Sequence, residues 1–129
     1  MSSEKRPTLD EARALYEHHA ELCKVFSNPI RLMILNALRT QELSVATLAE
    51  RLNIALGTVS PHLLMMKHRR VLVARKEGNQ VFYRLANPKM LKAFDLIRQI
   101  LHEQMRQHGR LARRLDQERA QMASHGKGR

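Results

Sequence analysis

The sequence has little of what disulfide-bonded, membrane-spanning or enzymatic proteins contain. It has one cysteine, which excludes an internal disulfide. It has no apolar run of the roughly 18 residues that a membrane span needs, and its start, MSSEKRPTLD, has no apolar segment typical of a secretory signal. A Gly-rich phosphate loop and the H-E-x-x-H and G-x-S-x-G motifs are also missing. We therefore expect a cytoplasmic protein that is not an enzyme, binds no cofactor and has no membrane partner.

Basic residues clearly outnumber acidic ones, and they are unevenly placed. The 129 residues include 23 Lys and Arg against 12 Asp and Glu, which gives a net charge of +11. The excess is concentrated in residues 62–84 and 106–129, each with a net charge of +5. In a chain that fits one domain, this indicates a polyanionic partner, most often a nucleic acid. The alternative is a basic protein whose charge only keeps it soluble.

Helix start and stop signals predict three helices in the first half of the chain. A capping box precedes a helix over 9–26, an Asn-Pro pair precedes a second over 29–39, and a serine cap precedes a third over 44–52. Asn53 tolerates the left-handed conformation that ends helices. The residues expected to face inward from the second helix are Ile30, Met33, Ile34, Ala37 and Leu38.

A fourth helical pattern, over 56–69, contains two residues that disfavour helix interiors, Gly57 and Pro61. A start near Thr58–Ser60 would place the proline in the first turn and would use a better cap than Ala55. A kink at the proline is the alternative, and we expect the late start. In either case the core-facing residues are Val59, Leu63 and Met66.

Beyond this helix the apolar pattern alternates and then becomes helical again. Residues 72–85 predict two short strands around a Gly-Asn turn, and a long helix follows from 88 to at least 107, with Gly109 as a candidate break. The apolar stripes of the first and last helices exceed what one small core needs, which indicates a dimer. The expected parts are a flexible N-terminus over 1–8, a winged-helix DNA-binding and dimerisation domain over 9–108, a helical extension over 109–123 and a flexible basic tail over 124–129.

This order of elements predicts a mostly α (α+β) fold, a winged helix-turn-helix with a two-stranded β wing. Two helices joined by a tight turn, followed by a basic hairpin, place two DNA-contacting features next to each other, and the second helix of such a pair reads the major groove. Three stretches carry a family resemblance: FSNPIRLMILNAL, LSVATLAERLNIALGTVSPHLLMM and VARKEGNQVFYRLAN. They resemble the ArsR/SmtB family of bacterial winged-helix repressors, over about residues 12–108.

The resemblance implies a homodimeric repressor whose long N- and C-terminal helices form the dimer interface. Such a protein binds a palindromic double-stranded DNA operator and leaves it when an inducer, often a metal ion, binds; the inducer of this chain is unknown. The alternative from another class is a nucleoid-type architectural protein that coats DNA without an inducer. A regulator discriminates strongly between DNA sequences, whereas a coating protein does not.

The outward face of the fourth helix and the hairpin supply the expected DNA contacts. Ser and Thr can bond several bases, apolar side chains can read thymine methyl groups, and basic side chains bind phosphates. The expected contact residues are Thr58, Ser60, His62, Leu64, Lys67, His68, Arg75, Lys76, Asn79, Gln80 and Arg84. In the family a basic residue often stands in place of Leu64. An alternative for Leu64 and Met65 is packing against the hairpin or the long helix.

Both metal sites that recur in the family lack ligands in this sequence. Ser44 and Ala46 stand where the third-helix site has thiolates. The last-helix site keeps Asp95 and His108 but has apolar residues at its other two positions, which leaves no closed tetrahedral shell. We therefore expect no metal at either site.

Cys23 is the remaining candidate for sensing, with His19 one turn earlier on the same helix face. The pair is interpreted either as a redox or sulfur-reactive thiol, or as two metal ligands completed by a histidine of a second chain. The alternative is that Cys23 is a small buried hydrophobe on a stripe with Tyr16 and Phe26.

Overall fold

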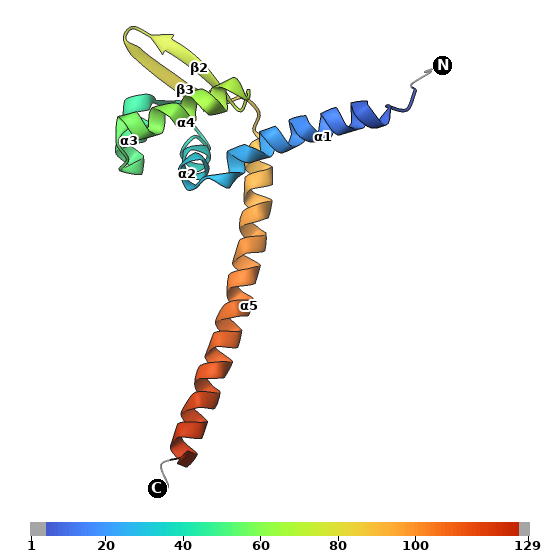
Figure 1. The fold of residues 1–129 in the computed structure, drawn as a ribbon. Coiled ribbons are helices and arrows are strands. Elements are labelled where there is room, and N and C mark those ends of the chain that lie inside the picture. The colour runs from blue at the N-terminus through green and yellow to red at the C-terminus, as the bar shows by residue number, and fades with distance from the viewer. Residues whose placement is uncertain (1–4, 127–129) are drawn as a thin grey trace. The chain divides into compact units, whose positions relative to one another are not determined.

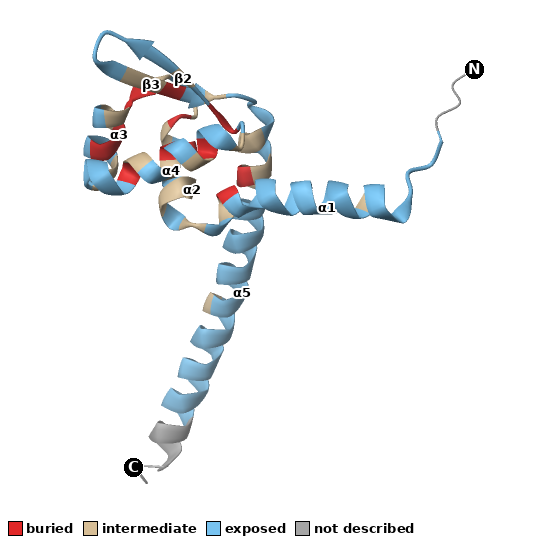
Figure 2. Cartoon of the chain, turned by 45° about the horizontal axis from the view of Figure 1, so that its top comes forward, coloured by how far each residue is buried: buried red, intermediate tan, exposed pale blue. Residues whose placement is uncertain are grey.

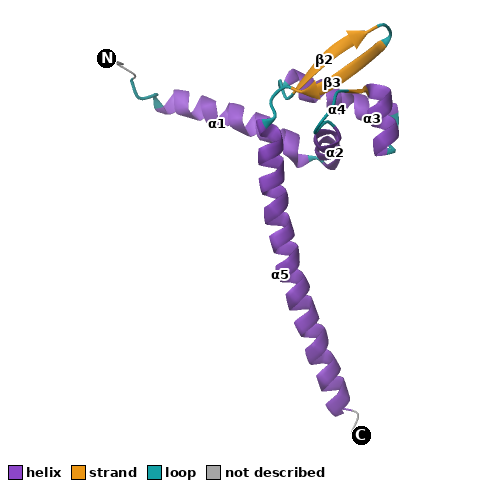
Figure 3. Ribbon diagram, turned by 180° about the vertical axis from the view of Figure 1, so that it is seen from behind, coloured by secondary structure: helices purple, strands orange, loops and turns teal. Residues whose placement is uncertain are grey.

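The structure, a computed structural model, describes residues 5–126 (Figure 1). Side chains are described up to residue 121. It consists mostly of helices, with a small antiparallel sheet (Figure 3). The described residues fall into two compact units, one ending at Lys92 and the other beginning at Ala93. The elements are α1 (Leu9–Cys23), a 3₁₀ turn η1 (Lys24–Ser27), α2 (Pro29–Ala37), β1 (Leu43–Ser44), α3 (Val45–Leu52), α4 (Leu56–His68), β2 (Leu72–Glu77), β3 (Gln80–Leu85) and α5 (Lys89–Gly126).

The predicted caps of the first three helices are confirmed. Thr8 accepts a hydrogen bond from the Glu11 backbone N–H at 3.1 Å, and the Glu11 carboxylate accepts one from the Thr8 N–H at 2.8 Å. Asn28 caps α2 by accepting from two backbone N–H groups, and Ser44 caps α3 by accepting from the Thr47 N–H at 3.1 Å. Asn53 ends α3 with a φ of 54°. The helix predicted over 9–26 is shorter than expected, because its last turn tightens into η1.

The core of the first unit lies where α2, α3, α4 and the sheet meet (Figure 2). Its fully buried side chains are Val25, Ile34, Leu35, Leu48, Val59, Leu63, Met66 and Val71. The expected inward face of α2 is partly wrong, since Leu35 is buried while Met33 is 41% exposed. The buried residues at this end of α2 are Ile34, Leu35 and the C-cap residue Leu38, so the core-facing side is turned toward Leu35 and away from Met33.

The sheet has three strands in the order β1–β3–β2, all antiparallel. The predicted hairpin is confirmed, with Glu77 opposite Gln80 across a Gly78-Asn79 turn. Gly78 has a φ of +61°, which the first position of such a tight turn favours. The strand β1 was not predicted; it pairs Leu43 with Tyr83 and adds a third strand to the hairpin.

The late start predicted for α4 is wrong. The backbone N–H groups of Thr58 and Val59 both donate to the Ala55 carbonyl, at 2.9 and 3.1 Å, so the helix begins at Leu56 with no side-chain cap. Pro61 therefore lies inside the helix and offers no N–H to the Gly57 carbonyl. Both residues are exposed, so water can reach that carbonyl. The two backbone hydrogen bonds to the Ala55 carbonyl, not the best available side-chain cap, define where this helix begins.

The helix α5 runs without interruption through Gly109, which therefore does not break it. A Cβ added at Gly109 would meet one atom within 4 Å, on the Arg113 side chain at 3.9 Å. In the second unit this helix exposes a series of large apolar side chains, each 45% to 60% exposed: Leu96, Ile97, Ile100, Leu101, Met105, Leu111 and Leu115. The tails predicted as flexible, 1–8 and 124–129, lie partly outside the described residues. Among the helices that are described, none combines the length and apolar character of a membrane span.

Candidate nucleic-acid interface

The helices α3 and α4 form a helix-turn-helix. Asn53, Ile54 and Ala55 connect them, and the Ile54 N–H donates to the Ala49 carbonyl at 3.0 Å, which closes the end of α3. Leu48 of α3 and Leu63 of α4 are both fully buried. This packing leaves the opposite face of α4, the second helix, toward solvent.

The predicted contact residues of α4 differ in their exposure. Thr58, Leu64, Lys67 and His68 are exposed, whereas Ser60 and His62 are half-buried. Leu64 is 59% exposed, so within the first unit it does not pack against the hairpin, as one alternative had it. Together with Met65, Leu64 lines a hollow that also includes Glu21 of α1. The outward face of α4 therefore exposes a large apolar side chain, Leu64, among polar and basic ones.

His62 faces the body of the first unit, where it meets Arg31 of α2. Its Nδ1 lies 3.4 Å from Arg31 Nη1. Burial, and then the Arg31 charge, hold the pKa of His62 below its usual value of 6.5. The guanidinium is held in turn by the Lys24 carbonyl at 2.7 Å and by Ser27 Oγ at 3.4 Å. The buried Nε of Arg31 has no hydrogen-bond partner among the described residues. The Nδ1 side of the His62 ring therefore contacts Arg31 and does not point toward solvent.

A second contact fastens α4 to α1. Arg69, which follows α4, donates through Nη1 to the Glu21 carboxylate and also to the Glu21 carbonyl, the latter at 2.9 Å. Lys24 Nζ approaches the same carboxylate at 2.7 Å. Hydrogen bonds from Lys24 and Arg69 lower the pKa of Glu21 to about 2. The sequence gives no local signal for this long-range pair.

The hairpin β2–β3, here called the wing, divides the predicted basic contacts between its two faces. Side chains alternate along a strand, and directly opposed residues share a face. Arg75 opposes Phe82, so it shares a face with Gln80 and Arg84. Lys76 opposes Val81 and lies on the other face, together with buried Leu72 and Tyr83. The last predicted wing contact, Asn79, is in the turn at the tip.

Arg75 is already paired within the wing. Its Nε and Nη2 donate to Glu42 Oε1 at 3.0 and 2.6 Å, and its Nη1 donates to Glu77 Oε2 at 2.7 Å. Its guanidinium carbon lies 4.8 Å from the centre of the Phe82 ring. These bonds raise the pKa of Arg75, and the Arg75 hydrogen bond lowers the pKa of Glu42. Lys76, in contrast, has no ion pair with any residue that the structure describes.

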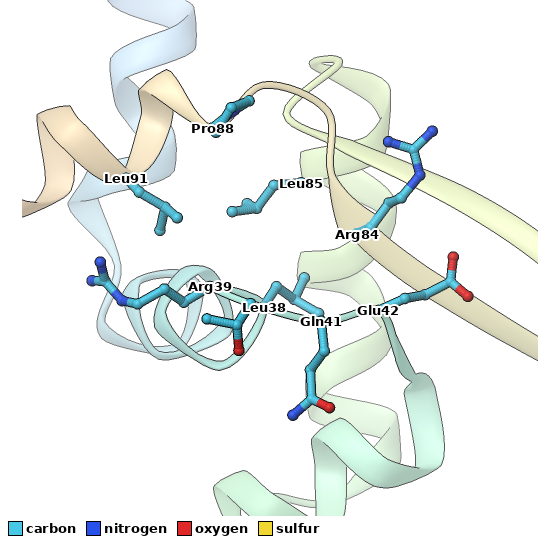
Figure 4. A pocket seen from close by; sticks show the side chains of 9 residues that line it. Leu38, Arg39, Gln41, Glu42, Arg84, Leu85, Pro88 and Leu91 are labelled. Carbon is cyan, nitrogen blue, oxygen red and sulfur yellow. The ribbon is translucent and has the colours of Figure 1, made fainter.

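A hollow of about 300 Å³ lies at the base of the wing (Figure 4). Leu85 and Leu91 face the opening from one side and Leu38 from the other, while Arg84 and Arg39 lie at opposite ends. Glu42 stands on the rim beside Arg84, whose charge contributes to lowering the Glu42 pKa. The hollow marks where the end of α2 and the last strand of the wing come together.

The candidate sensing residues lie on the surface of α1. Cys23 and His19 are exposed, and Tyr16 is 71% exposed. The alternative that Cys23 is a small buried hydrophobe is therefore wrong for the single chain. Among the side chains that the structure describes, those of residues 5–121, no three His, Cys, Asp or Glu gather as metal ligands would. Ser44, at the position of a family thiolate, is 7% exposed and is used as the cap of α3.

Comparisons with known proteins agree with this fold. The family model described as "Bacterial regulatory protein, arsR family" matches residues 28–71, which contain the helix-turn-helix. An uncharacterised HTH-type transcriptional regulator of Methanocaldococcus jannaschii, MJ1325, is 34% identical over 83 residues, which cover 64% of this chain and 93% of that protein. The chain belongs to the ArsR family. Because the family consists of transcriptional regulators, the expectation that this member is not an enzyme is confirmed.

Two further relatives of this ArsR-family chain are informative. The transcriptional repressor PagR of Bacillus anthracis is 36% identical over 75 residues, which cover 57% of this chain and 75% of PagR. The homodimeric winged helix-turn-helix DNA-binding domain of Mb0332 from Mycobacterium bovis has a TM-score of 0.67 at 29% identity, and the match covers 77% of this chain and 92% of that domain. The predicted winged helix-turn-helix fold and family resemblance are thereby confirmed.

Proposed function

We propose that this ArsR-family regulator is a homodimeric repressor that binds a palindromic DNA operator and is released by an inducer. The observation that supports this most directly is the exposed outer face of α4 beside a basic wing, both in the first unit. The repressor PagR and the homodimeric DNA-binding domain of Mb0332 support it by similarity.

The outer face of α4 supplies the proposed base contacts. Thr58 and Ser60 offer hydroxyl groups that can bond several bases, and Leu64 offers an apolar contact for a thymine methyl group. Lys67 and His68 add donors near the end of the helix. His62 meets Arg31, so we assign it to the orientation of α4 as well as to DNA contact.

Exposed basic and polar side chains of the wing supply the proposed phosphate contacts. Lys76, Asn79, Gln80 and Arg84 are all exposed and lie on the two strands or at the tip between them. A phosphate contact adds affinity for every DNA sequence and makes binding depend on salt. The wing thus contributes affinity, while α4 contributes sequence preference.

Dimerisation is supported by apolar side chains that remain exposed in each unit. None of the residues of α1 is buried, and its Leu15 is 69% exposed. On α5, Ile97 and Leu101 are 52% and 45% exposed and lie one turn apart. Exposed apolar side chains that repeat along a helix are typical of an interaction site. Cys23 and His19 lie on α1, so a signal received there would act on a helix of the proposed interface.

Selection from a random DNA library, followed by footprinting of the selected site, tests the proposal. We expect a palindrome with half-sites about one helical turn apart, bound at least about 10³-fold more tightly than unrelated DNA. Leu64→Ala should change the preferred base at one position of each half-site. Lys76→Ala should weaken binding to all sequences equally. Little discrimination between sequences would instead favour the DNA-coating alternative.

A further inference from the structure

We infer that Arg75 is a positioning residue, which ties the wing to the edge of the sheet through Glu42, and that phosphate contact is left to Lys76 and Arg84. This inference rests on the proposed DNA binding. It separates basic residues that the sequence alone treats as equivalent. A basic residue on a DNA-binding hairpin is ordinarily interpreted as a phosphate contact. Arg75, however, is already paired with Glu42 and Glu77.

The tie crosses the sheet from one edge strand to the other. Glu42 comes directly before β1, at one edge, and Arg75 is on β2, at the opposite edge. The central strand β3 lies between them, and the guanidinium passes over its Phe82 ring at 4.8 Å from the ring centre. The Arg75–Glu42 contact therefore joins two strands that do not pair directly with each other.

The hydrogen-bonding capacity of the guanidinium is largely used by these partners. Nε and Nη2 both donate to Glu42 Oε1, and Nη1 donates to Glu77 Oε2, so all three nitrogens are engaged. Two carboxylates face the Arg75 guanidinium, and the charge of Arg84 lies near one of them, Glu42. A phosphate at Arg75 would have to displace these bonds and approach two carboxylates. Lys76 lies on the other face of the wing, and no described carboxylate forms an ion pair with it that a phosphate would have to displace.

The two partners of Arg75 are not equivalent, and this difference provides a matched control. Glu77 is on the same strand, two residues away, and its side chain is 65% exposed. Glu42 belongs to a different part of the chain, and its side chain is 27% exposed. Neutralising either carboxylate removes the same charge, but only the loss of Glu42 removes the side-chain contact between β2 and the segment that precedes β1.

DNA affinity measured over a range of salt concentrations tests the inference in the full chain. Removing a carboxylate near DNA should strengthen binding if only charge matters. We expect instead that Glu42→Gln weakens binding about two- to fivefold, while Glu77→Gln does not weaken it. Arg75→Ala should weaken binding by a similar factor with an unchanged salt slope, and the double variant should be no weaker than either single one. Lys76→Ala should reduce the slope by about 1.

Amide hydrogen exchange of the free protein provides a readout that does not depend on DNA. Glu42→Gln and Arg75→Ala should both speed exchange in the wing, residues 72–85, and Lys76→Ala should not. Tighter DNA binding by Glu42→Gln, a slope reduced by about 1 in Arg75→Ala, or unchanged exchange in both variants would overturn the inference. If the wild-type protein does not bind DNA, the proposed function fails instead, and the exchange data alone decide whether the tie exists.

Discussion

Arg31 of α2 and His62 of α4 lie against each other, with Nη1 and Nδ1 3.4 Å apart. The neutral imidazole can accept an N–H from the guanidinium, but the protonated ring has no acceptor and is repelled. Burial and this neighbouring charge together lower the His62 pKa. The helix that we propose to read DNA thus includes a ring that the fold keeps neutral.

This arrangement predicts that acid destabilises the protein through His62. Because the pKa in the folded state lies below the unfolded value of 6.5, the unfolded chain binds protons first as pH falls. The contribution is fully present well above pH 6.5 and is lost as pH falls through 6.5 toward the folded-state pKa. Urea unfolding at pH values from about 7.5 to 5.5 should show a smaller loss in His62→Gln than in wild type. Exposed His68 on the same helix provides the control variant, His68→Gln; an equal pH slope in wild type and His62→Gln would contradict the assignment.

A second prediction concerns the exposed apolar face of α5. Ile97→Glu and Leu101→Glu place a charge where we propose a second copy to pack, so each should shift the protein toward monomer and weaken operator binding. Gln99→Glu adds the same charge on a different helix face and should leave the dimer intact. Sedimentation at micromolar concentration measures the change. A wild-type protein that is monomeric under these conditions would refute the dimer.

Ser44 provides a test of the α3 cap. Its hydroxyl accepts from the Thr47 N–H at 3.1 Å and donates to Thr47 Oγ1 at 2.9 Å, and the residue is 7% exposed. Ser44→Ala should lower the free energy of unfolding by about 1 kcal/mol. Thr40→Ala, at an exposed position in the preceding loop, should change it by no more than about 0.5 kcal/mol. Chemical denaturation measures both, and equal stability of the two variants would show that the cap contributes nothing.

Zinc or arsenite at stoichiometric levels should not release the protein from DNA through the two usual family sites. The third-helix site has lost both thiolates, and Ser44 there serves as a helix cap. The last-helix site keeps Asp95 and His108 but has Ile97 and Leu111 in the other positions. Fluorescence anisotropy of labelled operator DNA measures release. Zinc-driven release that disappears in Asp95→Ala or His108→Ala would show that the last-helix site functions.

Cys23→Ser separates a sensing role from a structural one. Because Cys23 is exposed, we expect the variant to keep its fold, with a stability change within about 0.5 kcal/mol. A sulfur-reactive or oxidising effector that releases wild-type protein from DNA should then have no effect on the variant. Release of both proteins by the same effector would exclude Cys23 as the sensor.

What the sequence predicts well is what neighbouring residues determine. The caps at Thr8, Asn28 and Ser44 and the Gly78-Asn79 turn each involve residues within three positions of one another, so their signals are local. The cap preference of Thr58 predicts the wrong start for α4, because backbone hydrogen bonds to the Ala55 carbonyl begin this helix without any side-chain cap. Gly109 did not end α5, since one glycine costs a helix only about 1 kcal/mol.

What the sequence did not predict depends on contacts between distant residues. The strand β1 has only two residues, too few to produce an alternating pattern, and it exists because β3 offers it a partner. Arg75 looks like any other basic wing residue until Glu42 is placed beside it. Candidate contacts on α4 were identified from helical spacing, but the inward orientation of His62 depends on Arg31.

The strand β1 also has a consequence for the order of folding. Pairing Leu43 with Tyr83 closes a loop that contains both α3 and α4, whereas the β2–β3 hairpin closes over two residues. Closing the longer loop costs more chain entropy, so we expect the hairpin to form before β1 joins it. The Arg75–Glu42 ion pair needs both events. We therefore expect loss of this ion pair to speed unfolding more than it slows folding, which stopped-flow unfolding and refolding of Glu42→Gln would measure.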